Sequence, residues 1–125
     1  MQDRFKFRVW NKEQQKLYFW EDLEKSKGDN SFYWCMLQAQ NDEKNNILMQ
    51  CTGLKDKNGK LIYEGDILQE NWHKYILEWG NGAYVIKDIK TGTSYMFTSG
   101  LCIEKSEVIG NIYENIDLLE VKNEN

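Results

Sequence analysis

The chain has 125 residues, of which 41% are hydrophobic and 14% aromatic. This is enough apolar material for one folded domain and excludes a disordered chain. The net charge of −4 gives the chain as a whole no attraction to nucleic acid or anionic membranes. No signal peptide or membrane-spanning run is recognisable, and three widely spaced cysteines do not form a disulfide framework. We therefore expect a soluble, cytoplasmic protein with free thiols at Cys35, Cys51 and Cys102.

The N-terminal part predicts a β-hairpin followed by loops and further strands. Residues 4–10 alternate between polar and apolar, which is the pattern of a strand with one buried face. Residues 16–20 predict the returning strand of this hairpin. The aromatic segment 31–38 and the apolar segment 47–51 predict two more strands, separated by polar loops.

The segment CTGLKDKNGKLIYEGDIL, residues 51–68, predicts tightly turned antiparallel structure. Three glycines, Gly53, Gly59 and Gly65, separate its short apolar runs. Glycine adopts the positive φ angles that many β-turns need, so each of the three is expected in a turn. The spacing of these glycines matches no phosphate-binding loop.

Residues 75–79 and 84–88 predict a β-hairpin closed by a two-residue type I′ turn at 81–82. Its register should place two pairs on one face, Trp79 opposite Tyr84 and Leu77 opposite Ile86. A second two-residue turn at 91–92 should then place Ile86 opposite Phe97 and Asp88 opposite Tyr95, which continues the core face into a third strand.

The last predicted strand covers residues 107–113, where Gly110 marks a bulge or a close backbone approach. Residues 115–119 predict a single helical turn. Between residues 66 and 113 the chain therefore holds five short strands with no long amphipathic helix between them. This pattern favours a small barrel or sandwich over alternating strands and helices.

Four residues of the first strand form the most interesting functional pattern, because alternation places them on one strand face: Arg4, Lys6, Arg8 and Trp10. The spacing of about 6.6 to 6.8 Å between them suits a charged polymer backbone, and an indole can stack on a base. An acidic protein would also suit these cations. The alternative is that outward cations merely protect an edge strand from aggregation.

Most of the five tryptophans are expected in the core, where large aromatic side chains supply much of the burial. Trp72 stands in a polar loop before a strand, and we expect it to be at least half-buried. If it were exposed, it would mark a groove for a peptide or protein partner.

Glu64, Asp66 and His73 are the residues from which a small metal-dependent hydrolase could be built. Gly65 between the two acids indicates a turn, and an aspartate after glycine commonly accepts hydrogen bonds from nearby backbone. We therefore interpret the acids as structural and His73 as a surface residue. No catalytic, cofactor or metal site is predicted.

Three blocks together carry a family resemblance: KFRVWNKEQQKLYF at 6–19, the segment at 51–68, and EVIGNIYEN at 107–115. In this order they resemble the YopX-like family of small phage and prophage proteins. The chain departs from that pattern at Cys51, where relatives usually carry tyrosine, and at Ile116, where proline is frequent. The resemblance implies an SH3-like barrel and a phage context, and it implies no activity or cofactor.

The combined prediction is a mainly β protein with a small SH3-like barrel in its C-terminal half and an N-terminal hairpin region. The whole chain forms one domain, with the N-terminal region at 1–50, the barrel at 51–115 and a polar tail at 116–125. We expect a non-enzymatic phage or prophage accessory protein that binds a protein of phage or host, or a second copy of itself. The alternatives are nucleic-acid binding through the N-terminal strand and, less favoured, the hydrolase. The expected contact residues are Arg4, Lys6, Arg8, Trp10 and Trp72.

Overall fold

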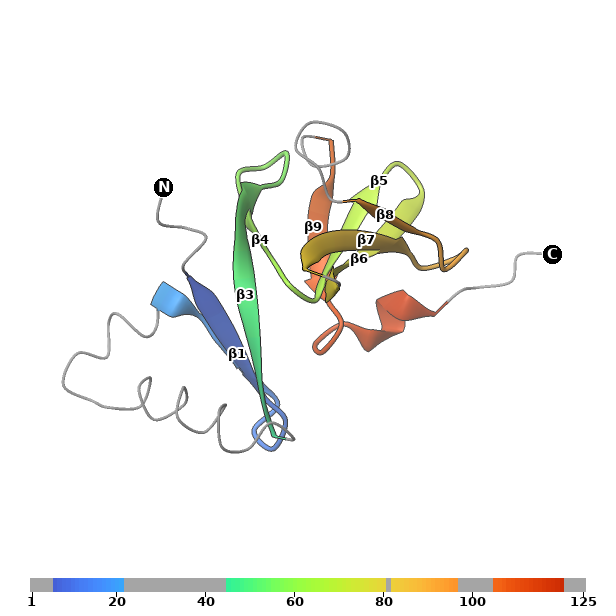
Figure 1. Ribbon diagram of the computed structural model, residues 1–125. Coiled ribbons are helices and arrows are strands. Elements are labelled where there is room, and N and C mark those ends of the chain that lie inside the picture. The colour runs from blue at the N-terminus through green and yellow to red at the C-terminus, as the bar shows by residue number, and fades with distance from the viewer. Residues whose placement is uncertain (1–5, 22–44, 81, 97–104, 121–125) are drawn as a thin grey trace.

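The computed structural model describes residues 6–21, 45–80, 82–96 and 105–120 (Figure 1). These residues form nine strands in two antiparallel sheets and a short 3₁₀ helix, so the prediction of a mainly β protein is confirmed. The first sheet has the order β2-β1-β3-β4, with β1 at Phe7–Asn11, β2 at Lys16–Tyr18, β3 at Asn46–Lys55 and β4 at Leu61–Tyr63. The second has the order β8-β7-β6-β5-β9, with β5 at Asp66–Glu70, β6 at His73–Gly80, β7 at Ala83–Asp88, β8 at Ser94–Met96 and β9 at Glu107–Asn111.

The five strands expected between residues 66 and 113 are present as the curled second sheet, while a closed SH3-like barrel and the division at residues 50 and 115 stay predictions. The helical turn expected at 115–119 is the 3₁₀ helix η2, Ile116–Leu119. The strand expected at 31–38 lies outside the described residues. In the described ranges, no helix is both long and apolar enough to span a bilayer.

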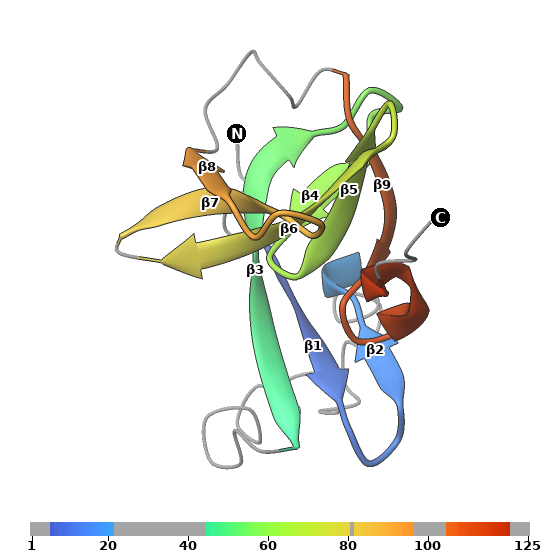
Figure 2. The ribbon, with the colours of Figure 1, turned by 90° about the vertical axis from the view of Figure 1, so that its right-hand side faces the viewer.

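Strand β3 is part of the first sheet but contributes side chains to the cores of both sheets, because it bends at Thr52 and Gly53. Its pairing with β4 shifts register between Cys51 and Lys55, and Gly53 has a φ of 82°. The Thr52 hydroxyl donates to the Ile62 carbonyl at 2.9 Å, which closes this bulge. Bulges increase strand twist, and Figure 2 shows β3 curving at its upper end. The first half of β3 therefore packs in the core of the first sheet, and the second half faces the other sheet.

Two cores result from this bend. In the first sheet, Met49 packs with Trp10 and Leu17. The second core consists of Ile62, Leu68, Leu77 and Ile86, with Leu54 of β3 packed against it. The buried free thiol of Cys51 lies between these positions on β3, as expected for a reduced cysteine.

Two of the three turns predicted from the glycines are confirmed, at Gly59 and Gly65, whereas the turn predicted at Gly53 is wrong because Gly53 lies within β3 at the bulge. Gly59 and Gly65 have φ values of 82° and 83°. In the first turn, the Asp56 carboxylate accepts from the backbone N–H groups of Asn58 and Lys60, each at 2.9 Å. Its other oxygen accepts from Val108 N–H at 2.8 Å and so ties this turn to β9.

The β6–β7 hairpin has the predicted register, with Trp79 opposite Tyr84 and Leu77 opposite Ile86. The predicted register of β8 is wrong, because Ile86 lies opposite Tyr95. The Asp88 carboxylate accepts from the N–H groups of Lys90 and Thr91 and thereby holds a four-residue loop at 89–92. The expected continuation of the core into this strand is also wrong, because all three residues of β8 are exposed.

Strand β9 contains the predicted bulge, located between Val108 and Gly110. Gly110 is also closely approached, by a side chain and not by backbone, because a Cβ there would lie 2.4 Å from Oδ1 of Asn115. That Oδ1 accepts from Asn111 N–H at 3.1 Å, and Asn115 N–H donates back to the Asn111 carbonyl. The turn after β9 thus needs a residue without a side chain at position 110.

Candidate binding surface

Arg8 is buried rather than presented on the strand surface, with only 3% of it exposed. Its Nη2 lies 2.6 Å from Oδ1 of Asp66 and donates also to the Glu64 carbonyl at 3.1 Å. Its guanidinium stands 4.7 Å from the centre of the Tyr63 ring. The β4–β5 turn covers the face of β1 that carries Arg8, so this face is not exposed to solvent. The prediction that Arg8 faces outward is therefore wrong.

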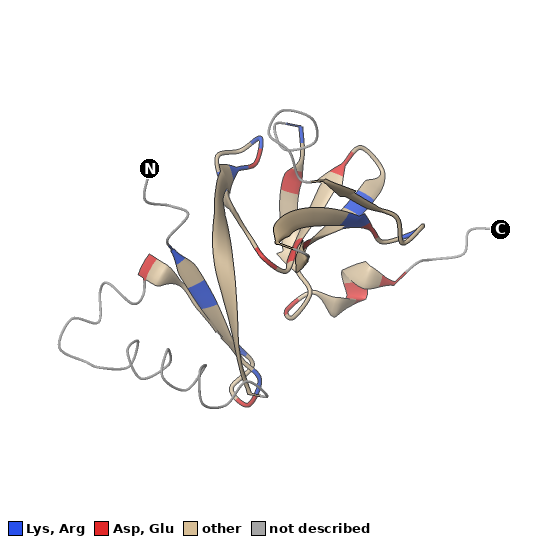
Figure 3. Ribbon diagram, viewed as in Figure 1, with Lys and Arg blue, Asp and Glu red and all other residues tan. Residues whose placement is uncertain are grey.

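Trp10 is also buried, with 4% of it exposed, and its ring stacks on Tyr113 at 5.9 Å between centroids. Lys6 is half-buried and forms an ion pair with Glu21 at 3.5 Å. Arg4 lies outside the described residues. Of the three described residues of the predicted row, Arg8 and Trp10 therefore do not face outward. The described basic and acidic residues are interspersed over both sheets (Figure 3).

The three residues considered for hydrolysis are not brought together. Asp66 and Glu70 are the two ends of β5, about 13 Å apart, and His73 pairs with Glu70 at the far end. Glu64 accepts from Gln50 N–H at 3.1 Å. No group of three metal-ligand side chains occurs in the described part of the chain.

The Asp66 carboxylate links the two sheets. Besides Arg8, its carboxylate accepts from Tyr63 N–H at 2.8 Å, which is the local backbone contact expected of an aspartate after glycine. Burial raises the pKa of the Asp66 carboxyl, and the Arg8 charge opposes this rise. Both oxygens are occupied, which confirms the structural interpretation of this acid.

Trp72 is exposed over 84% of its surface, so the expectation of a half-buried side chain is wrong. Among the four described tryptophans, only Trp10 is buried, so the expectation that most are in the core is wrong too. The β5–β6 turn explains the position of Trp72. Glu70 pairs directly with His73, which leaves Asn71, with a φ of 56°, and Trp72 as the two loop residues.

Trp72 begins a series of ring contacts that we call the aromatic row: Trp72, His73, Tyr75 and Tyr95. The successive ring centroids are 6.1, 6.2 and 6.4 Å apart. Half of Tyr95 and of the His73 side chain is exposed. The row crosses from the β5–β6 turn to the edge strand β8, on the face whose centre is the buried pair Leu77 and Ile86.

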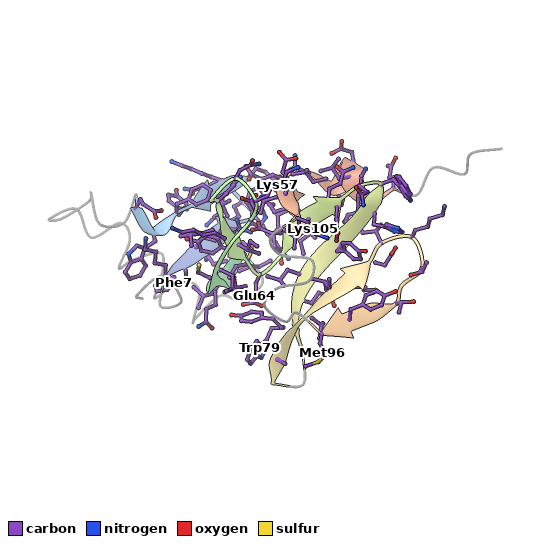
Figure 4. The ribbon with its side chains drawn as sticks, turned by 90° about the horizontal axis from the view of Figure 1, so that it is seen from above. Phe7, Lys57, Glu64, Trp79, Met96 and Lys105 are labelled. Atoms are coloured by element: carbon purple, nitrogen blue, oxygen red, sulfur yellow. The ribbon has the colours of Figure 1, made fainter. Side chains whose placement is uncertain are left out.

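The opposite end of β6 carries a second, smaller aromatic pair. Trp79 is 54% exposed and contacts Tyr84 edge-to-face at 4.8 Å. Figure 4 shows Trp79 at the free end of the β6–β7 hairpin, with Met96 also labelled there. Trp79 is thus an exposed tryptophan on the same strand that lies apart from the aromatic row.

Two acidic residues lie beside the aromatic row on the face that carries it. Glu70 is opposite His73, and Asp88 is opposite Tyr75. The nearer Asp88 oxygen lies 3.6 Å from Nδ1 of His73. Lys74 and Lys87 point to the other face, because successive side chains of a strand alternate.

Sequence reasoning identified Trp72 as a candidate but missed Tyr75 and Tyr95. Tyr75 lay in the correctly predicted hairpin, and period two would have placed it beside His73 on one face. Tyr95 could not be placed next to Tyr75, because the length of the loop before β8 was predicted incorrectly.

Comparison with known proteins identifies relatives but no activity. The sequence model described as "YopX protein" matches residues 6–120, nearly the whole chain. The crystal structure of protein EF1440 from Enterococcus faecalis is similar, with 27% identity and a TM-score of 0.54. The match covers 92% of this chain and 97% of that one. No protein of curated function matches the sequence. The family resemblance inferred from the three sequence blocks is confirmed.

Proposed function

Since this chain belongs to the YopX family, we propose that it is a phage or prophage accessory protein of the bacterial cytoplasm that acts by binding another protein. The aromatic row is the binding surface. The observation that carries the proposal is Trp72, because an indole exposed over 84% of its surface contributes almost nothing to the core.

Exposed aromatic rings in contact with one another favour protein recognition. Tryptophan and tyrosine are enriched at interface hot spots, because they bury much apolar area and lose few rotatable bonds on binding. Tyr95 adds half of its surface to the same face. Among the predicted contact residues that the structure describes, Trp72 is the most exposed, which supports its choice for this surface.

The two alternatives have weaker support. Nucleic-acid binding through residues 4–10 would have to proceed without Arg8 and Trp10, which are buried. A hydrolase would need Glu64, Asp66 and His73 at one point, and β5 separates Asp66 from His73.

Affinity capture with matched variants tests the proposal. The wild-type chain, Trp72→Ala with Tyr95→Ala, and Trp79→Ala would each be immobilised and exposed to lysate of cells that express the gene. We expect one protein, or a second copy of this chain, to be retained by the wild type and by Trp79→Ala and lost with the double variant. Retention that is the same for all three chains, or nucleic acid as the retained species, would contradict it.

A further inference from the structure

We infer that the aromatic row recognises an arginine side chain carried by an exposed segment of the partner protein. This inference rests on the proposed function, because it specifies the chemistry of the protein that the row binds. It is carried by the combination of aromatic rings and carboxylates on one face of the second sheet.

On the face of the aromatic row, the strand residues that carry a full charge are all acidic. They are Glu70 and Asp88, together with Asp66, which is paired with Arg8. The opposite face is mixed, because it carries two lysines and two acids, Lys74, Lys87, Glu78 and Glu107. Lys90 belongs to the loop beyond β7 and not to the strand face. A ligand on the row therefore meets negative charge within the sheet.

Asp88 is buried, with 5% of it exposed, so it supplies negative charge beside the rings and not a direct contact, and backbone N–H groups hold it in place. Its Oδ1 accepts from Lys90 N–H at 2.8 Å and from Thr91 N–H at 3.2 Å. Along β7, Asp88 stands opposite Tyr75, and Ile86 two residues earlier stands opposite Tyr95. The carboxylate thus belongs to the strand between the two tyrosine strands. Glu70, opposite His73, is only partly buried and supplies the carboxylate that solvent can reach.

Aromatic faces carry negative electrostatic potential, so a guanidinium is attracted to them and can stack flat on the indole. Carboxylates beside the rings strengthen this attraction, and the partly buried Glu70 carboxylate can accept bidentate hydrogen bonds from the guanidinium. The same carboxylates repel phosphate groups, so the row is poorly suited to a single-stranded nucleic acid, although rings alone would suit bases. The face favours a cationic protein segment over a nucleic acid.

The experiment uses nuclear magnetic resonance with two small probes, Nα-acetyl-arginine amide and its neutral analogue Nα-acetyl-citrulline amide. We expect arginine amide to shift the indole N–H signal of Trp72 saturably and citrulline amide to leave it in place. Glu70→Gln should weaken the interaction about 1.5- to fivefold, the range expected for one exposed ion pair. Trp79→Ala is the matched control and should bind arginine amide as the wild type does.

Equal shifts with arginine and citrulline amides, or shifts that Glu70→Gln leaves unchanged, would overturn the inference. A single-stranded oligothymidylate that shifts the Trp72 signal at lower concentration than arginine amide would overturn it in favour of nucleic acid. The capture experiment of the previous section has a separate readout. Suppose that the Trp72 and Tyr95 substitutions abolish capture of the partner, but arginine amide does not shift the Trp72 signal. The proposed protein-binding function would then stand, and only the inference that the row recognises arginine would be rejected.

Discussion

At the scale of single residues, Asp56 illustrates how one carboxylate organises two distant segments. It is buried and accepts from N–H groups of its own turn and from Val108 of β9. Burial raises the pKa of Asp56, but the N–H groups of Val108, Lys60 and Asn58 together lower it by more, so the pKa lies below its ordinary value of 3.8. The folded state therefore favours the ionised form.

We predict that Asp56→Asn lowers the free energy of unfolding at pH 7 by about 1–3 kcal/mol, because the amide cannot accept from all three donors. A folded pKa below 3.8 means that the stabilisation is complete above that pH and is lost as the pH falls through the folded pKa. Urea unfolding at pH 7 and pH 3 measures this. The difference in unfolding free energy between the wild type and Asp56→Asn should be smaller at pH 3 than at pH 7. Exposed Asp117→Asn is the control, and an equal difference at both pH values would contradict the prediction.

Substitutions of Trp10 and Trp72 should distinguish a residue that stabilises the fold from a residue that serves binding. Trp10→Ala should lower the free energy of unfolding by about 3–5 kcal/mol, because it leaves a cavity in a packed site beside Met49 and Tyr113. Trp72→Ala should change the free energy of unfolding by less than about 0.5 kcal/mol, since its side chain is exposed. Thermal unfolding of both variants is the measurement. A large loss for Trp72→Ala would mean that this residue belongs to the fold rather than to a binding surface.

At the scale of elements, the bulge of β9 and the turn after it depend on the missing side chain of Gly110. Any Cβ at this position would overlap the Asn115 side chain, whose Cγ would be 2.6 Å away. The Asn115 side chain cannot withdraw without releasing Asn111 N–H. The turn therefore tolerates no larger residue at 110.

Gly110→Ala should destabilise the protein by about 1–3 kcal/mol through this overlap. Gly80 at the end of β6 is the matched control, because a Cβ there would meet nothing within 4 Å. Gly80→Ala should leave stability nearly unchanged. Chemical unfolding of the two variants compares them directly, and equal stabilities would show that the Asn115 turn can rearrange.

The two hairpins of the second sheet show what the sequence could predict. In the β6–β7 hairpin, the turn residues and the apolar pattern agreed, so the register followed from local rules alone. Before β8, Thr91 and Gly92 suggested a similar short turn. There the Asp88 carboxylate stabilises a longer loop, and the apolar pattern could not reject the error because a shift of two residues keeps the same face. Side-chain hydrogen bonds to backbone were the missing information.

At the scale of the whole molecule, the Arg8–Asp66 ion pair joins the first sheet to the first strand of the second. A single sequence gives little signal for such a pair, because the partners are 58 residues apart. The alternation of residues 4–10 predicted a strand, which the structure has at Phe7–Asn11, but it could not reveal that another layer covers the polar face. For the same reason, the exposure of Trp72 could not be predicted, since it depends on which loop the second sheet leaves uncovered.

Arg8→Met should lower the free energy of unfolding by about 3–5 kcal/mol at pH 7, because it leaves a buried carboxylate without its counterion. Removing Arg8 also takes away the charge that opposes the raised pKa of Asp66. Protonation of Asp66 removes the unpaired buried charge in the variant. The loss of unfolding free energy should therefore become smaller as the pH falls from 7 toward 4. Urea unfolding over this range checks the trend. A loss that is constant with pH would contradict the role assigned to Asp66.

The central claim is that the aromatic row, and not the rest of the surface, contacts a protein partner. The most direct measurement is fluorine magnetic resonance of the chain labelled with 5-fluorotryptophan, before and after addition of the captured partner. Trp72→Phe and Trp79→Phe assign the signals of these two residues, which are the exposed tryptophans of the described part of the chain. We expect the Trp72 signal to shift or broaden and the Trp79 signal to stay in place. A partner that moves the Trp79 signal and leaves that of Trp72 unchanged would contradict the claim.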